Sequence, residues 1–250
     1  MRRPEIALAV VIGGFAAFVG AQIVRTPRAR GGDAAPRYAA TDTPDVLAPG
    51  TAPAPAAHDA AAVRRTLVAR AYGTYIGEIL AEQDSALHRW PDRRADPIRV
   101  WIEPTSSVSG WTANDPQLAR DGFLAWEQQA GIPVRFAFVA DSADAEVQLR
   151  WTERLEVAGR IGYTRVWRDG AGWLARGEIT IATYGPSPLA LDENVVRATA
   201  LHEVGHLLGL DHTRDTTSIM TPATHDAHML SNSDRATAEL LYAVTPGSVK

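Results

Sequence analysis

The 250-residue sequence contains no cysteine. Disulfide bonds, thiolate metal sites and cysteine nucleophiles are therefore excluded. The chain also lacks a strong excess of either charge, because 25 basic and 29 acidic residues leave a formal net charge of −4. A general polyanion-binding protein needs a basic face, so this balance argues against nucleic acid as a partner. Hydrophobic residues make up 46% and charged residues 22%, which excludes disorder throughout and leaves room for one or two domains.

Charged residues are also absent from residues 6–24, which follow a short charged start with Arg2 and Arg3. The run nearly supplies the ~20 apolar residues of a membrane-spanning helix. It is also compatible with a cleaved signal peptide, with Val19-Gly20-Ala21 as its cleavage site. Residues 1–24 are thus predicted to be a signal peptide or a retained membrane anchor. Either alternative predicts export, with the protein secreted, periplasmic or anchored and its folded part outside the cytoplasm.

Three further regions follow, and they differ in composition. Residues 25–58 are rich in Ala and Pro and almost lack large apolar side chains, so they predict a disordered, extended linker. Residues 59–95 form an N-terminal segment, either an integral cap or a propeptide. Residues 96–250 are long enough for a single hydrophobic core and show no internal repeat.

Local patterns predict a mixed order of helices and strands. A helix is expected around residues 59–72, whereas residues 74–90 fit either a hairpin or a further helix. Asp115-Pro116 is typical of a helix start, with Asp as the cap, and Gly131 of its end. Alternating or β-rich segments predict strands at 98–102, 134–139, 146–151, 161–167 and 178–183. The order indicates an α+β domain with one twisted sheet.

Residues 202–212 have the pattern H-E-x-x-H-x-x-G-x-x-H. His202 and His206 are four residues apart, so on a helix both imidazoles project from one face and can meet one Zn²⁺. Gly209 permits the positive φ that ends the helix, and His212 can then return as the third ligand. Three neutral imidazoles leave one tetrahedral position for water, which is typical of a catalytic site. Residues 194–208 have helical spacing, with Asp192 as a cap.

Glu203 follows the first of these histidines but is not expected to bind the metal. On the helix flank it can take a proton from a zinc-bound water, whose pKa the metal lowers to about 7. The same group can then pass the proton to a leaving amine. The sequence therefore predicts a catalytic Glu203 and metal ligands His202, His206 and His212.

This motif resembles that of the metzincin metalloproteases, in which a Met-turn follows the third histidine. Ser218-Ile219-Met220-Thr221-Pro222 stands at a suitable distance, with Met220 as the apolar floor beneath the zinc. Residues 230–242 are similar to the C-terminal helix of matrixins. The resemblance implies a metzincin-like α+β catalytic domain, with a twisted, mainly parallel or mixed sheet, an active-site helix and a C-terminal helix. It also implies a zinc endopeptidase that acts on proteins or peptides.

Several departures from the matrixin pattern refine this expectation. The matrixin thiol switch is excluded because there is no cysteine. Ser233-Asp234 stands where matrixins often have an Asp pair, and Pro222 stands where astacins and serralysins have a Tyr. Residues 140–185 lack the His/Asp cluster of a second, structural zinc site, so one zinc is predicted.

The resemblance also raises the question of a Ca²⁺ site, which matrixins often have. Hard cations need clusters of oxygen ligands, and loop carboxylates are mostly just solvated. The candidate ligands for calcium are Asp141, Asp144, Asp169 and Glu178.

Other residues remain open. Gly162-Tyr163-Thr164 is expected on an edge strand, where it either pairs with an extended substrate or is an ordinary strand. His225 and His228 either line the substrate cleft or are solvated loop residues. Two other functions stay open: a non-catalytic zinc-bearing extracytoplasmic binding module, and an exopeptidase.

Overall fold

The structure, a computed structural model, describes residues 45–46, 59–157, 159–222 and 229–250. Within these residues, six strands form one sheet in the order β1-β6-β7-β5-β3-β4. The strands are β1 (Asp45–Val46), β3 (Arg93–Ile102), β4 (Val134–Phe138), β5 (Val147–Thr152), β6 (Gly162–Arg168) and β7 (Leu174–Ala182). β6 is antiparallel to β7, and the other neighbouring pairs are parallel. The sheet is therefore mixed and mainly parallel, as predicted.

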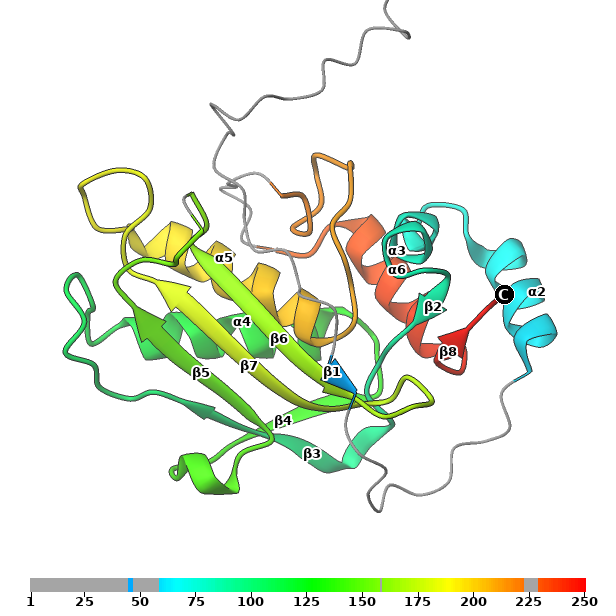
Figure 1. Cartoon of the computed structure of the whole chain (residues 1–250), viewed down its shortest axis with the longest axis horizontal. Coiled ribbons are helices and arrows are strands. Elements are labelled where there is room, and N and C mark those ends of the chain that lie inside the picture. Colours follow the sequence, from blue (N-terminus) through cyan, green and yellow to red (C-terminus); the bar gives the residue numbers. More distant parts are fainter. Residues whose placement is uncertain (1–44, 47–58, 158, 223–228) are drawn as a thin grey trace, which may run out of the picture. The chain divides into compact units, whose positions relative to one another are not determined.

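Two long helices cover one face of this sheet. α4 (Asp115–Gln129) packs against α5 (Glu193–Leu207), and α5 also contacts β6 and β7, as Figure 1 shows. The remaining elements are α2 (Ala60–Arg70), α3 (Ile76–Glu82), the 3₁₀ turn η1 (Ser142–Asp144), α6 (Asn232–Tyr242), β2 (Ala86–Leu87) and β8 (Gly247–Ser248). The α+β architecture is consistent with a metzincin catalytic domain.

Strand alternation explains which face the helices cover. Val147, Leu149 and Trp151 of β5 are buried, whereas the residues between them are more exposed. From the helix layer, Phe123 and Trp126 of α4 are completely buried in the same core. Because side chains on a strand alternate between faces, this pattern fixes the face on which the helices lie.

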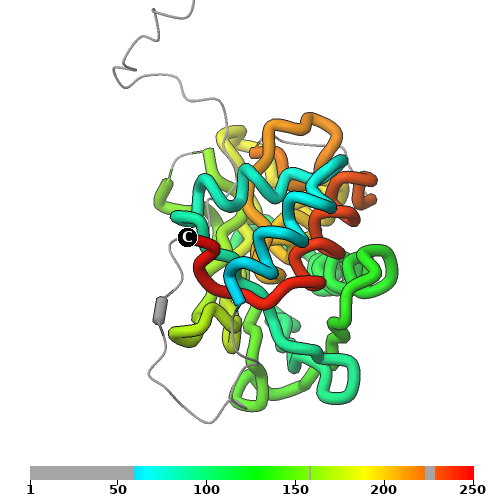
Figure 2. Tube along the Cα trace, turned by 90° about the vertical axis from the view of Figure 1, so that its right-hand side faces the viewer, coloured from blue at the N-terminus to red at the C-terminus, as the bar shows by residue number. Residues whose placement is uncertain are grey.

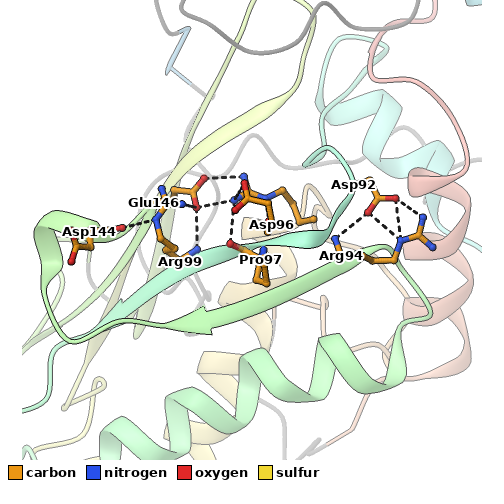
Figure 3. Close-up of polar contacts among 8 residues, drawn as sticks. Asp92, Arg94, Asp96, Pro97, Arg99, Asp144 and Glu146 are labelled. Atoms are coloured by element: carbon orange, nitrogen blue, oxygen red, sulfur yellow. Dashed lines mark hydrogen bonds and ion pairs between the residues drawn. The ribbon is translucent and has the colours of Figure 1, made fainter.

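An ion-pair cluster joins the beginnings of β3 and β5. The Arg93 guanidinium donates to both carboxylate oxygens of Glu146, each at 2.8 Å, and the backbone N–H of Arg99 donates to the same carboxylate at 3.0 Å. Figure 3 shows Glu146 beside Arg99, whose guanidinium also donates to the carbonyl of Asp144. A bidentate pair of this kind is stronger than an exposed one because Arg93 is only 8% exposed. The cluster joins the residue before β5 to two positions along β3, next to the Val100–Val147 pair of the ladder.

The segment before the sheet packs against the end of the chain. β2 pairs with β8 in an antiparallel ladder, and Figure 2 shows the early part of the domain beside the C-terminal segment. The Arg64 side chain donates to the carbonyl of Val249 at 2.9 Å, and Arg89 donates to that of Val244 at 2.8 Å. The predicted boundary at residue 96 falls inside β3, so the sheet includes the last residues of the 59–95 segment.

Several local predictions can be compared with these elements. α2 lies within the helix expected around 59–72, and residues 74–90 contain a helix followed by a short strand rather than a local hairpin. The cap predicted at Asp115 was one residue off. Asn114 precedes α4, and the Asp115 side chain instead accepts hydrogen bonds from the backbone N–H and hydroxyl of Thr112.

The predicted anchor or signal peptide lies outside the described residues, as does the linker apart from Asp45 and Val46. These two residues form β1 and pair with β6, so the prediction of disorder is wrong for them. In the part of the chain that is described, every helix is too short or too polar to cross a membrane.

Candidate metal centre

α5 is held firmly at both ends. The Asp192 carboxylate caps it by accepting from the backbone N–H groups of Asn194 and Val195. The indole N–H of Trp126 donates to the carbonyl of Leu201 at 2.8 Å, and that of Trp90 donates to Leu207 at 2.8 Å. The second bond satisfies a carbonyl in the last turn, where no intrahelical donor remains. The helix is thus a rigid support for the side chains it carries.

The three motif histidines converge. His202 and His206 are 2% and 1% exposed, and His212 is half-buried. The Nε2 atom of His206 lies 3.1 Å from that of His202 and 3.3 Å from that of His212. Two nitrogens that each lie about 2.0–2.1 Å from a tetrahedral ion are about 3.3 Å apart. These two spacings fit a single zinc ion, and the ligand atoms of all three histidines lie within 4.8 Å of one another.

The hydrogen bonds of the other ring nitrogens favour the same conclusion. Nδ1 of His202 lies 2.7 Å from the carbonyl of Ile219, and Nδ1 of His206 lies 3.0 Å from that of Leu210. A carbonyl only accepts, so each Nδ1 carries a proton, and in the neutral ring Nε2 then presents its lone pair to a metal ion. Two neutral rings whose Nε2 lone pairs face each other at 3.1 Å repel unless a cation lies between them.

The third histidine reaches the others through a sharp turn after the helix. Gly209 has φ +98°, which favours glycine, as predicted. A Cβ at this position would also overlap the carbonyl oxygen of His88, which packs directly on the turn. The hydroxyl of Tyr242 donates to the carbonyl of Leu208 at 3.1 Å and so closes the C-terminus of α5. The turn is therefore fixed by residues far from it in the sequence.

Glu203 is completely buried beside the first ligand. Its Oε2 accepts a hydrogen bond of 2.6 Å from the Thr164 hydroxyl, whereas its Oε1 is buried without a hydrogen-bond partner among the described residues. Burial raises the pKa of Glu203 to about 8, although the Thr164 hydrogen bond and the charge of Arg160 act to lower it. A divalent cation on the neighbouring histidines would favour the ionised carboxylate.

Two residues of β6 shape the space around this carboxylate. A Cβ at Gly162 would overlap Oε1 of Glu203, so only glycine lets the strand pass so close. Two positions further on, Thr164 is fully buried and orients Oε2. The sequence prediction placed these residues on an edge strand and did not connect them with Glu203. A glycine inside a β-rich segment was the only available signal. In the sheet, β6 is second from the edge, because the two residues of β1 pair with Trp167 and Arg168.

Met220 lies beneath the ligand helix. It is fully buried, and a Cβ at Gly205 would overlap its sulfur, so the absence of a side chain at Gly205 lets the methionine contact the helix backbone directly. Trp126 packs against the same glycine. Met220 thus packs against the helix that carries two of the histidines, and this contact depends on a glycine that the motif leaves unspecified.

Asp234 of α6 ties this Met-turn to the C-terminal helix. Its carboxylate accepts from the Ser218 hydroxyl, from the backbone N–H of Ile219 at 3.1 Å and from the Tyr75 hydroxyl at 3.2 Å. It also accepts from Ser231 in a capping box that begins α6. The second aspartate of the matrixin pair is thus not needed for this connection.

The other predicted residues are not assembled into a site. Among the described residues, the histidine triplet is the one group of three or more potential ligands that could hold a metal ion. The carboxylates proposed for calcium do not form such a group: Asp141 and Asp169 each cap a turn, and Glu178 pairs with Arg176. His225 and His228 lie outside the described residues.

The matrixin family model matches residues 190–243, from just before α5 to just after α6. The match includes all three histidines, Glu203, Met220 and Asp234. No curated protein matches the chain. The match supports a zinc metallopeptidase, and the chemistry of the three imidazoles agrees with it. Over residues 190–243, the chain is matrixin-like, with the histidines of the family's zinc motif brought together at one point.

Proposed function

We propose that this chain is a zinc-dependent endopeptidase in which His202, His206 and His212 hold one zinc ion. The observation that carries the proposal is the convergence of three imidazoles beside a buried carboxylate whose Oε1 has no described hydrogen-bond partner. A buried polar atom without a partner is costly and needs an explanation. A water molecule or substrate group that donates a hydrogen bond to Oε1 provides one.

The proposed reaction is hydrolysis of a peptide bond. When bound, zinc would lower the pKa of a water molecule and polarise the scissile carbonyl. Glu203 takes one proton as the water oxygen bonds to the carbonyl carbon, and it gives this proton to the amine as the C–N bond breaks. Thr164 holds Oε2, so that Oε1 is the oxygen that exchanges the proton. Met220 supports the helix beneath the ligands.

The position of β6 favours an extended peptide as the substrate. Gly162 brings this strand into contact with Glu203. A peptide that pairs with the strand by main-chain hydrogen bonds would therefore carry its backbone past the carboxylate. This arrangement suits cleavage within a chain, whereas an exopeptidase also needs a group that binds a terminal charge. We further propose that the domain acts after export, secreted or anchored through residues 6–24.

Replacement of the base tests the mechanism. Glu203→Ala should still bind zinc, but its rate of casein hydrolysis should fall about 10²–10⁴-fold, which is the contribution of a general base. Glu193→Ala, at the exposed start of the same helix, should retain both properties. Full activity of Glu203→Ala would refute the assigned role.

The wild-type protein separates the alternatives. Zinc binding without hydroxamate-sensitive cleavage of casein would identify a non-catalytic binding module. Cleavage of free peptides but not of peptides blocked at both ends would identify an exopeptidase.

A further inference from the structure

The third histidine differs from the other two because no helix carries it. His212 stands three residues after Gly209, in a loop that continues to Asp215. A residue in such a loop has more backbone freedom than one inside a helix, and binding a ligand through it has an entropic cost. Contacts that fix the loop beforehand would lower this cost.

α3 supplies contacts on the N-terminal side of this histidine. The side-chain amide of Gln83, just after the helix, donates to Oδ2 of Asp211 at 2.9 Å. The other oxygen of Asp211 accepts from the backbone N–H of His212 at 2.7 Å. One carboxylate thus connects Gln83 with the backbone of the ligand.

α3 also holds the loop on the C-terminal side. Oε1 of Glu78 accepts from the hydroxyl of Thr213 at 3.2 Å, and Oε2 accepts from the backbone N–H of Arg214 at 2.9 Å. Thr213 is 2% exposed, and its own N–H donates to the carbonyl of Met220 at 3.1 Å. Hydrogen bonds to an ionised carboxylate are stronger than neutral ones. His212 therefore lies between two points that the same helix fixes.

We propose that Glu78 and Gln83 are positioning residues that fix the loop of His212, so that α3 is part of the metal centre. The inference rests on the proposed function only in assigning the three histidines to zinc. It requires that the functional protein retain α3. Residues 59–95 were expected to be either an integral cap or a propeptide. The inference favours an integral segment, at least from Glu78 onwards.

Zinc affinity is the direct measurement, made on the full chain by competition with a chromophoric chelator. Loss of a group that orients a metal ligand weakens zinc binding by about 10–100-fold. Glu78→Ala and Gln83→Ala should each weaken it by about 10-fold, and Glu78→Gln, which keeps one acceptor oxygen, by less. Glu82→Ala is the matched control because this side chain is exposed on the same short helix. The visible absorption spectrum of bound Co²⁺ should show altered coordination in Glu78→Ala and Gln83→Ala only.

The outcomes separate this inference from the proposed function. Variants that melt earlier without zinc but bind zinc as tightly as wild type would overturn the inference, because α3 would then stabilise only the fold. If Glu78→Ala is too unstable to purify, the zinc affinities of Glu78→Gln and Gln83→Ala test the inference. A wild-type protein that binds zinc but cleaves nothing contradicts the proposed function and leaves the inference standing. A wild-type protein that binds no zinc overturns both.

Discussion

The two sides of the metal centre are built differently. On one side, His202, Glu203 and His206 lie on α5 and are almost completely buried. On the other, His212 and the Met-turn lie in loops whose positions depend on α3 and α6. The helix orders its residues through local backbone hydrogen bonds, whereas the loops are ordered by side chains of other elements, such as Glu78, 135 residues before Thr213, and Asp234, 15 residues after Ile219. The helix side is thus determined locally and the loop side by the tertiary fold.

This difference indicates where the site can be weakened separately. Replacing a side chain on α5 removes a ligand or the base but leaves the helix capped and packed. Replacing a residue whose hydrogen bonds hold a loop, such as Glu78, keeps all three ligand histidines but changes the position of His212. Variants of the first kind should therefore lower zinc affinity more than variants of the second kind.

The largest effect is expected when a ligand is removed from either side. Structural zinc binds with ~10–16 kcal/mol, so one ligand of three corresponds to about 3–5 kcal/mol, or roughly 10²–10⁴-fold in affinity. His206→Ala and His212→Ala should both lose zinc to this extent and lose hydrolysis with it. Chelator competition measures the first quantity and casein digestion the second.

The stability of the metal-free protein should separate these two variants. His206→Ala removes a completely buried ring from the helix, whereas His212→Ala removes a half-buried one from the loop. Urea unfolding with chelator present should show the larger loss for His206→Ala. Equal losses in the two variants would contradict the distinction between the two sides.

The same distinction explains what could be predicted from the sequence. The spacing of His202 and His206 fixes their relation on any α-helix, and Gly209 signals the turn, so the ligand set was visible locally. Strands β3 to β7 were found because alternation depends on neighbouring residues only, whereas the two-residue strands β1, β2 and β8 are too short to show it. The roles of Thr164, Glu78 and Gln83 depend on contacts between elements distant in sequence, and no local pattern indicates such contacts. Asp234 was noticed only as half of an expected pair.

The next largest effect is expected at Asp234. This fully buried carboxylate accepts from Ser218, Ile219, Ser231 and Tyr75, and burial together with its charge raises the pKa of Tyr75 well above its usual value. Asp234→Asn would replace one acceptor oxygen with an amide group that itself donates. That group would face the donors of Ser218, Ile219, Ser231 or Tyr75 without an acceptor for its own hydrogens. It should lower the free energy of unfolding by about 2–4 kcal/mol, the cost of breaking a buried network.

Urea unfolding of the metal-free protein measures this loss. Asp215→Asn is the matched control, because that carboxylate also bonds serine and threonine side chains but is more exposed. The control should lose about 1 kcal/mol or less. If the two variants lost the same amount, Asp234 would not be the main connection between the Met-turn and α6.

The smallest effect concerns His88, whose carbonyl packs on the Gly209 turn and whose ring is 6% exposed. Burial, and to a lesser extent the charge of Arg168, lowers the pKa of His88 to about 4. The unfolded chain takes up this proton near pH 6.5 and the folded chain does not, so stability falls as the pH drops from about 6.5 to 4. Between pH 7 and pH 5 this single group should cost about 2 kcal/mol of the free energy of unfolding.

His88→Gln removes the titration and keeps a polar side chain, so it isolates this contribution from that of the ligand histidines. With chelator present, urea unfolding at pH 7 and at pH 5 should show a smaller loss for the variant than for wild type. The difference of about 2 kcal/mol comes from a residue of the loop side, since the Gly209 turn rests on His88. An identical pH dependence in both proteins would mean that the ring is accessible to protons in the folded state and that this part of the loop side is less tightly packed than the helix side.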